Sequence, residues 1–337
     1  MLPKKEKSDN PILETVLRPT SLAEYVGQDK VKQALKLFID AGKSRGSVSE
    51  HILLYGPPGM GKTTLAHILS RELNGELKIT SGPAIEKTGD LAAILTNLQD
   101  KDILFIDEIH RLPKPVEEAL YPVMEEFALD IVLGKGPAAR TVRLSIPRIT
   151  IIGATTRIAL LSAPLRDRFG LISRLDFYST DEMAEIIKRS SALLKIPISK
   201  EAVNEIAIRA RKTPRIANRI LKRVRDLIEV ENHKKIDMAV VNSLFKILDI
   251  DKQGLNDMDI KYLQIIANKF EGGPVGLTTL AMSLSEDKQT IEEYIEPYLI
   301  QLGFIKKTSK GRTITNKAYA HLNIPRKLGS AEQQKML

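Results

Sequence analysis

The chain has 337 residues and carries 51 Lys and Arg against 42 Asp and Glu, a net charge of +9. This length suffices for two or three domains with hydrophobic cores, and 43% hydrophobic residues are ordinary for a globular protein. The absence of cysteine excludes disulfides, thiolate metal sites and cysteine nucleophiles. No apolar run approaches the roughly 20 residues of a membrane span, and the N-terminus lacks the apolar core of a secretory signal. We therefore expect a cytoplasmic protein with no membrane partner.

The first predicted elements are a polar N-terminal segment, residues 1–16, and a helix. Val31, Leu35 and Phe38 recur at a spacing that places them on one face of that helix. The pattern predicts a helix that packs on the domain that follows it.

A glycine-rich turn comes next, between a strand and a helix. The largely apolar run 51–55 predicts a buried strand, and apolar residues at helical spacing follow the sequence GPPGMGKTT at 56–64. Glycines in this setting let backbone N–H groups converge on an anion at a helix N-terminus. Lys62 would reach the β- and γ-phosphates, and the Thr63 hydroxyl would ligate Mg²⁺. The alternative, a glycine turn without a ligand, does not account for the full motif.

The next apolar strand ends in two acids. It has the sequence ILFIDE at 103–108, after a shorter predicted strand at 77–80 and a helix at 91–98. In open α/β sheets, ligands bind at the carboxyl ends of the strands. Asp107 would hold Mg²⁺, and Glu108 would orient and deprotonate the attacking water. Without the preceding glycine-rich motif, the two acids would indicate only a strand that exits into solvent.

Alternating apolar residues on both sides of a glycine turn predict a β-hairpin over 129–146. Inserted between a helix near 115–127 and the next strand, such a hairpin would project, and its apolar residues would need a partner surface. A hairpin that folds back on its own domain is the equal alternative from this pattern.

A further buried strand, 149–153, leads into the polar sequence ATTR, and two arginines follow in a turn. If the strands are neighbours, this polar end would lie beside Asp107 and Glu108. Either of the two arginines, Arg166 or Arg168, presented from a stiff turn, could stabilise the charge that develops on a transferred phosphoryl group. The alternative for such an arginine is a solvated or ion-paired surface side chain.

From about residue 179 to 250 the pattern is helical, and most of its many basic residues suit an exposed helix face. Pro214 is different, because proline fits the first turn of a helix and leaves Arg215 at the helix start.

The last segment combines three predicted helices, 258–270, 276–284 and 288–302, with two short strands around the turn at Lys310. This order describes a winged helix-turn-helix, a common DNA-binding module. Residues 303–337 hold eight basic residues and one acidic residue, which indicates a polyanion partner; a solvated basic tail is the alternative.

Five motifs occur together: GPPGMGKTT at 56–64, LFIDEIHRL at 104–112, GATTR at 153–157, SAPLRDRFG at 162–170 and TPRIANR at 213–219. This combination resembles the RuvB family, AAA+ motors that drive branch migration of Holliday junctions in bacteria. The stretch GGPVGLTTLA at 272–281 is also similar, which a generic AAA+ protein would not share.

The resemblance implies roles for the matching residues. Catalysis would fall to Lys62, Asp107, Glu108, the sensor-1 residue Thr156, the arginine finger Arg168 and the sensor-2 residue Arg215. ATP or ADP would be bound by Leu17, Arg18, Tyr25, Val26, Gly59, Met60, Gly61, Lys62, Thr63, Thr64, Tyr178, Pro214 and Arg215, and Mg²⁺ by Thr63 and Asp107. Duplex DNA would contact Lys307, Lys310 and Arg312; the family commonly has arginine at the first position, so lysine keeps the charge and loses bidentate reach.

The resemblance also implies partners: a homo-hexameric ring around double-stranded or junction DNA, RuvA docked on the 129–146 hairpin, and the RuvC resolvase as a further candidate. We thus expect an α/β fold with three domains. They are an AAA+ P-loop domain with a parallel sheet over 1–178, a small helical lid over 179–250 and a C-terminal winged helix over 251–337.

The predicted function is an ATP-dependent DNA motor for branch migration in recombination and repair. From the residues alone two other classes stay open, an ATP-switched DNA loader or initiator and a DNA-binding scaffold with a vestigial P-loop. Sustained ATP consumption stimulated by long duplex DNA separates the motor from the switch.

Overall fold

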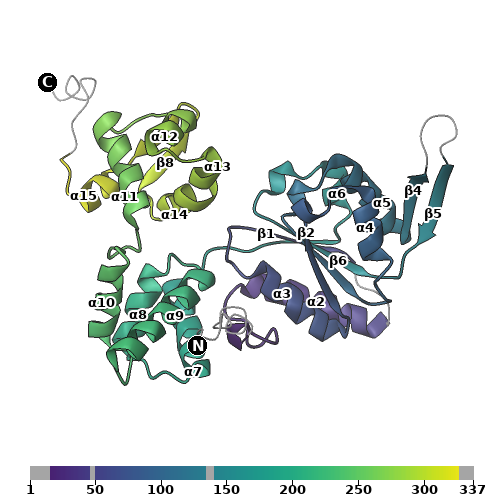
Figure 1. Ribbon diagram of the computed structural model, residues 1–337, viewed down its shortest axis with the longest axis horizontal. Helices are drawn as coiled ribbons and strands as arrows, with labels where there is room; N and C mark the ends of the chain where they lie inside the picture. The colour runs from purple at the N-terminus through teal and green to yellow at the C-terminus, as the bar shows by residue number, and fades with distance from the viewer. Residues whose placement is uncertain (1–15, 46–49, 134–139, 326–337) are drawn as a thin grey trace, which may run out of the picture. The chain divides into compact units, whose positions relative to one another are not determined.

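The computed structural model describes residues 16–45, 50–133 and 140–325 (Figure 1). The chain divides into two compact units, one formed by 1–186 with 213–215 and the other by 187–212 with 216–337. The polar segment 1–15, the predicted hairpin turn at 134–139 and the basic residues beyond 325 lie outside the described residues. Within the described ranges no helix is both long and apolar enough to cross a membrane.

The first unit is built on a five-stranded parallel sheet in the order β2-β3-β6-β1-β7. Its strands are short and mostly apolar, as expected where a parallel sheet is covered on both faces. They are β1 (Ile52–Tyr55), β2 (Leu77–Ser81), β3 (Ile103–Asp107), β6 (Thr150–Thr155) and β7 (Leu171–Arg174).

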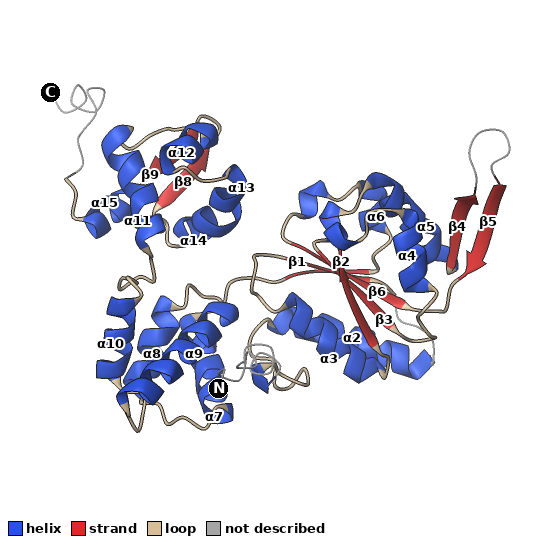
Figure 2. Ribbon diagram, in the orientation of Figure 1, coloured by secondary structure: helices blue, strands red, loops and turns tan. Residues whose placement is uncertain are grey.

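Helices cover both faces of this sheet, with α2 and α3 on one side and α4, α5 and α6 on the other (Figure 2). They are α2 (Asp29–Arg45), α3 (Lys62–Leu73), α4 (Thr88–Leu95), α5 (Lys114–Glu126) and α6 (Ala163–Asp167), with short 3₁₀ turns η1 (Gly82–Ala84), η2 (Ile109–Arg111) and η4 (Ile158–Leu160). The core under α4–α6 buries apolar residues of β1, β3 and β6, which fixes these three strands as the centre of the sheet.

The strand β6 lies between β1 and β3, with Ile106 of β3 opposite Gly153 of β6. Because all five strands are parallel, the loops that follow β1, β3 and β6 emerge at the same edge of the sheet. The sequence-based expectation that the end of the 149–153 strand lies beside Asp107 and Glu108 is therefore confirmed.

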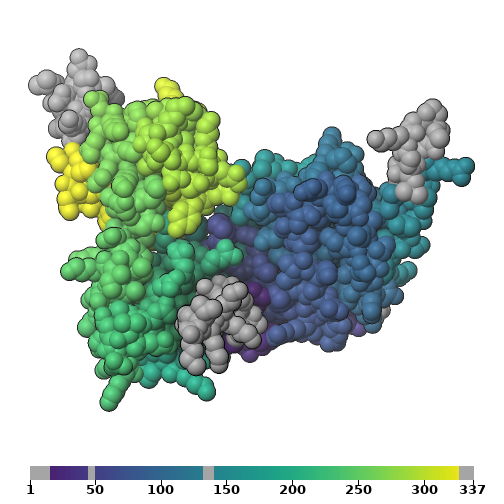
Figure 3. All heavy atoms as spheres, in the orientation of Figure 1, coloured from purple at the N-terminus to yellow at the C-terminus, as the bar shows by residue number. Residues whose placement is uncertain are grey.

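The predicted hairpin is present as β4 (Ala128–Leu133) and β5 (Arg140–Ser145), paired antiparallel and separate from the main sheet. Leu129 and Ile146 at its base are buried in the core of the first unit. Farther along β5, Thr141, Val142 and Arg143 are exposed. Ile131 and Leu144 pack against the same core, and only the outer part of the hairpin extends away from the rest of this unit (Figure 3). Of the two alternatives, the projecting hairpin is the one that forms.

The second unit consists of helices followed by a small hairpin. Its helices before residue 250 are the end of α7 (Thr180–Leu193), α8 (Lys200–Arg209), α9 (Pro214–Glu231) and α10 (Met238–Ile247). After residue 250 come α11 (Asp257–Gln264), α12 (Leu277–Leu284), α13 (Lys288–Thr290), α14 (Glu296–Gln301), β8 (Ile305–Thr308), β9 (Gly311–Ile314) and α15 (Asn316–Leu322). Two of the three helices predicted here contain a π-helical segment, η5 (Ile265–Lys269) after α11 and η6 (Ile291–Ile295) before α14. Three helical segments and a β-hairpin around one core form the predicted winged helix.

Candidate nucleotide-hydrolysis and DNA-binding sites

The loop between β1 and α3 has a backbone that requires glycine. Gly61 has a φ of 100° and is the N-cap of α3, and a Cβ on it would lie 2.4 Å from the Tyr25 hydroxyl oxygen. Gly59 has a φ of 79°. Such left-handed positions favour glycine, and phosphate-binding loops use them to aim backbone N–H groups at an anion. The backbone of this loop therefore suits the phosphate-binding role predicted from its sequence.

Lys62 begins α3, and its buried amine donates to the carbonyl oxygens of Gly56 at 2.8 Å and Pro57 at 2.9 Å. Burial lowers the pKa of Lys62 to about 8, the nearby carboxylate of Asp107 raises it, and Arg215 lowers it further. The amine is therefore held over the loop, where the phosphates of a nucleotide would neutralise its charge.

Asp107 and Glu108 end β3 at the same edge. One carboxylate oxygen of Asp107 accepts the Glu108 backbone N–H at 2.9 Å. Glu108 has a left-handed φ of 48°, and its carboxylate pairs with Arg111 at 3.0 Å. Both partners of this pair are largely exposed, so the contact is worth about 0–1 kcal/mol and does not fix Glu108.

The neighbouring strand β6 carries Thr155, whose hydroxyl bonds the His110 ring nitrogen at 2.9 Å, and Thr156 follows directly. The strand β6 is paired with β3 on one side and with β1 on the other. The carboxyl ends of β3 and β6 therefore lie at the same edge of the sheet as the P-loop, which follows β1. The His110–Thr155 bond links the loops after β3 and β6. Sequence reasoning missed it, because a 45-residue separation leaves no local signal.

Two residues of the first unit could supply the protein ligands of Mg²⁺, the hydroxyl of Thr63 at the start of α3 and the carboxylate of Asp107. Among the described residues there is no cluster of three His, Cys, Asp or Glu that could hold a metal by itself. Mg²⁺ commonly takes only one or two protein oxygens and completes its octahedron with phosphates and water, so this donor set fits it.

The predicted helix start at Pro214 is confirmed, since α9 begins there. A Cβ added to Gly59 would lie 2.7 Å from Thr213 Cγ2 and 3.1 Å from Arg215 Cβ, so this short segment packs against the P-loop. Thr213–Arg215 accordingly belongs to the same compact unit as the P-loop. The structure thus brings Arg215 to the phosphate-binding loop.

Two tyrosines far apart in the sequence meet behind the P-loop. The hydroxyls of Tyr25 and Tyr178 lie 3.0 Å apart, and each also lies within hydrogen-bond distance of the Met60 carbonyl. Burial raises the pKa of both phenols, that of Tyr178 to about 12, so both stay neutral. The remaining predicted contacts of the nucleoside are the buried Leu17 and the half-buried Arg18 and Val26.

Arg168 caps the C-terminus of α6, and its side chain is 23% exposed. Its guanidinium donates to the Pro164 carbonyl at 2.7 Å and to Glu125 at 3.2 Å, and lies 4.3 Å from the centroid of the Tyr121 ring. Within the described part of the chain, its Nε is buried without a hydrogen-bond partner. Arg168 is therefore a clamped side chain rather than a freely solvated one. Sequence reasoning missed Glu125 and Tyr121, because the contact crosses from α5 to α6.

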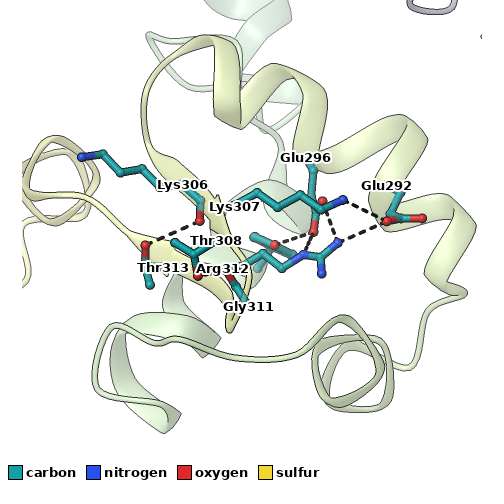
Figure 4. Close-up of polar contacts among 9 residues, drawn as sticks. Glu292, Glu296, Lys306, Lys307, Thr308, Gly311, Arg312 and Thr313 are labelled. Atoms are coloured by element: carbon teal, nitrogen blue, oxygen red, sulfur yellow. Dashed lines mark hydrogen bonds and ion pairs between the residues drawn. The ribbon is translucent and has the colours of Figure 1, made fainter. Parts of the chain in front are cut away.

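The basic residues of the wing differ in their exposure and in their ion pairs (Figure 4). Lys307 and Lys310 are exposed, and the Lys307 amine lies 3.2 Å from a carboxylate oxygen of Glu292. Arg312 is only 7% exposed, and its guanidinium donates to Glu296 at 2.6 and 3.2 Å and to Glu292 at 3.3 Å. The sequence groups Arg312 with the two lysines as a DNA contact, whereas the structure commits its guanidinium to two carboxylates that lie 16 and 20 residues away.

Comparisons with known proteins match the chain in three consecutive parts. The matched families are the Holliday junction DNA helicase RuvB P-loop domain over residues 17–175, the RuvB AAA lid domain over 178–251 and the RuvB C-terminal winged helix domain over 252–323. The chain belongs to the RuvB family.

Known members of the family are similar over almost their whole length. The Holliday junction branch migration complex subunit RuvB of Clostridium kluyveri is 56% identical over 315 residues, which cover 94% of this chain and 90% of that protein. The solved structure of the Thermotoga maritima RuvB Holliday junction branch migration motor is 48% identical, covers 92% of this chain and 99% of its own, and has a TM-score of 0.84. A mutant of the same Thermotoga maritima protein has 49% identity and a TM-score of 0.85.

Family membership makes the chain a P-loop ATPase and an ATP-dependent motor of Holliday junction branch migration. It decides between the function classes that the residues left open, and sets aside both the loader and the vestigial scaffold.

Proposed function

We propose that the residues at the carboxyl edge of β1, β3 and β6 form the ATP-hydrolysing centre of this motor. The observation that supports the proposal is the strand order, in which β6 lies between β1 and β3, so that the loop after β6, with Thr156, emerges at the same edge as the P-loop and the two acids. Lys62 and the loop amides bind the β- and γ-phosphates, and Glu108 positions the attacking water and takes up its proton. Thr156 would detect whether the γ-phosphate is present.

Mg²⁺, when bound, would supply positive charge against the negative charge that develops during phosphoryl transfer. Thr63 and Asp107 are the residues that would hold it. The amine of Lys62 leaves the carbonyls of Gly56 and Pro57 for the phosphates, which offer it full charges in place of dipoles. Leu17, Arg18, Tyr25, Val26 and Tyr178 would enclose the nucleoside, and Arg215 with Pro214 would close over the phosphates.

Arg168 would complete the centre of a neighbouring subunit. A guanidinium held by Glu125, Tyr121 and a backbone carbonyl is pre-oriented, which is what a finger that stabilises transition-state charge requires. Hydrolysis would then depend on assembly into a homo-hexameric ring. Separate subunits would therefore consume little ATP.

The winged helix would bind the DNA. Lys307 and Lys310, exposed on the wing, would contact phosphates of the duplex, which supports affinity without sequence preference. Arg312 would support this surface by anchoring β9. We divide the chain into a P-loop domain over 1–178, a lid over 179–250 and a winged helix over 251–337. The three matched families, which span 17–175, 178–251 and 252–323, support this division.

The β4–β5 hairpin would bind RuvA, with RuvC as a further partner of the same cytoplasmic assembly. The hairpin exposes Val142, 39% accessible, on the face opposite Thr141. Val142→Asp should leave ATP hydrolysis of the ring unchanged and weaken the RuvA complex about tenfold or more. Thr141→Asp, the same added charge on the other face, is the matched control.

The decisive experiment is branch migration of a synthetic four-way junction, with and without RuvA. We expect ATP-dependent migration that RuvA stimulates, and its loss in Glu108→Gln, which keeps the shape of the side chain and removes the base. Migration by Glu108→Gln at the rate of the unaltered protein would refute the role assigned to Glu108.

A further inference from the structure

The loop between α8 and α9 holds a buried arginine that the hydrolysis mechanism does not use. Arg211 and Lys212 have φ angles of 53° and 54°, two successive non-glycine residues in the left-handed region. Such a pair is strained and persists only where the surroundings fix it. The Arg211 side chain is 7% exposed, so its contacts within the second unit are what fix this turn.

Arg211 is held by the winged helix. Its guanidinium forms a two-pronged ion pair with Asp259 of α11, at 3.1 and 3.2 Å, and Asp259 is completely buried. The guanidinium also lies 5.3 Å from the Tyr294 ring and 4.7 Å from the Tyr298 ring, and donates to the Tyr294 carbonyl at 3.4 Å. A fork–fork pair between two aromatic rings fixes orientation as well as distance.

The same contacts lead on to the wing. Tyr294 and Tyr298 belong to the continuous helix of η6 and α14. Glu296 lies between them in the sequence, and its carboxylate contacts the wing instead of Arg211. Glu296 is 2% exposed and receives the guanidinium of Arg312 from β9, as well as the Tyr262 hydroxyl at 3.0 Å (Figure 4). One helix thus joins Arg211 on one side to the wing on the other.

In the opposite direction, Arg211 is separated only by Lys212 from the segment that packs on the P-loop. Thr213 and Arg215 lie against Gly59, so a shift of the phosphate-binding loop displaces them directly. The chain therefore runs without interruption from the nucleotide site, through a strained turn, to a buried ion pair of the DNA-binding domain.

We propose that Arg211 is a positioning residue that locks the lid helices α8–α10 to the winged helix, so that a displacement of Arg215 reaches the wing as a rotation of one body. The ion pair can act as a lock because its hydrogen bonds are directional. Apolar packing is not directional, whereas the paired guanidinium and carboxylate accept one geometry. Without this lock, ATP would still be hydrolysed, but the wing would lag behind the lid. The inference builds on the motor function and not on which wing residues touch DNA.

The test is the number of base pairs migrated per ATP hydrolysed, measured on a four-way junction with full rings. In Asp259→Asn this ratio should fall at least about fivefold, the lower end of usual coupling strengths, while the ATP turnover per subunit and the affinity for duplex DNA stay within about twofold. Asp257→Asn is the matched control. It removes the same charge from the same helix, at an exposed pair with Lys261, and should leave the ratio unchanged.

A second variant guards against a simple folding defect. Arg211→Met combined with Asp259→Asn removes both charges of the ion pair, while the side-chain oxygen at 259 can still accept the Asn256 N–H that caps α11. This double variant should unfold at a temperature close to that of the unaltered protein and still show the reduced ratio. An unchanged ratio in the folded double variant would overturn the proposal. Loss of ATP turnover in step with migration would also overturn it, because Arg211 would then act on catalysis.

Discussion

Lys62 is the residue whose charge state should change most when a nucleotide binds. Burial lowers its pKa from 10.5 to about 8, so the amine is protonated below that pH and neutral above it. A bound triphosphate favours the charged form and raises the pKa again. Binding at a pH of about 8 should therefore take up about half a proton from solution, and none at a pH about two units lower.

Titration calorimetry in two buffers of different ionisation enthalpy measures this uptake. Lys62→Arg serves as control, because a guanidinium does not lose its proton in this range. Identical binding enthalpies in both buffers at a pH of about 8 would contradict the assignment.

Tyr121 should position the finger Arg168 through its ring and not through its hydroxyl. The ring centroid lies 4.3 Å from the guanidinium, while the hydroxyl bonds Glu117 at 3.0 Å. A cation–π contact of about 0.5–2 kcal/mol corresponds to about 2- to 30-fold in rate. Tyr121→Leu should lower kcat by this factor with KM for ATP unchanged, and Tyr121→Phe should retain kcat. Equal losses in both variants would show that the hydroxyl matters instead.

At this scale the sequence predicted the residues that a local motif contains, Lys62, Thr63, Asp107 and Glu108, because their chemistry depends on neighbours in the chain. It could not predict Glu125 beside Arg168 or Asp259 beside Arg211. Both contacts join elements that only the tertiary fold brings together, 43 and 48 residues apart.

At the scale of the elements, two basic residues of the wing should have different roles. Arg312 anchors β9 through buried ion pairs, whereas Lys307 is exposed on the paired strand β8. Arg312→Ala would leave the buried carboxylate of Glu296 without its charged partner, with only the Tyr262 hydroxyl still bonded to it, which costs about 3–5 kcal/mol in the free energy of unfolding. Lys307→Ala breaks only a half-exposed pair with Glu292, worth about 0–1 kcal/mol, and should instead lower the affinity for duplex DNA.

Denaturant unfolding and DNA binding measured on both variants separate the two roles. The salt dependence of binding should lose about one phosphate contact in Lys307→Ala. If Arg312→Ala were as stable as the unaltered protein and bound DNA more weakly, the direct-contact prediction made from the sequence would be the correct one.

The order and type of the elements followed from the sequence, because period-2 and helical patterns are strong in short buried strands and amphipathic helices. The strand order did not, since a pattern does not say which strands pair; only the polar ends of 103–108 and 149–157 hinted that these two are neighbours. The π-helical segments in 258–270 and 288–302 were also missed. Each π-helical segment covers only five residues, so the apolar spacing in the rest of the predicted helix stays that of an α-helix.

For the whole molecule, ATP hydrolysis should require contact between subunits. Arg168→Ala should keep ATP binding and lower turnover by about 10³ to 10⁵. Mixing it with Lys62→Ala subunits, which have an intact finger but cannot hold the phosphates, should restore part of the activity. The measurement is ATP turnover across mixing ratios at constant total protein, with ring assembly monitored in parallel. No recovery in intact mixed rings would refute a finger that acts on the neighbour.

The placement of β6 between β1 and β3 has a mechanical consequence. Gly153 at its centre has Leu53, Ile109 and Phe169 within 3.0 to 3.2 Å of the position a Cβ would take, so a larger residue would not fit there, and β6 is paired with β1 on one side and β3 on the other. We therefore expect the sheet to keep its shape when the nucleotide at its edge changes. The movement that follows hydrolysis should then arise outside the sheet, where the start of α9 packs against the P-loop.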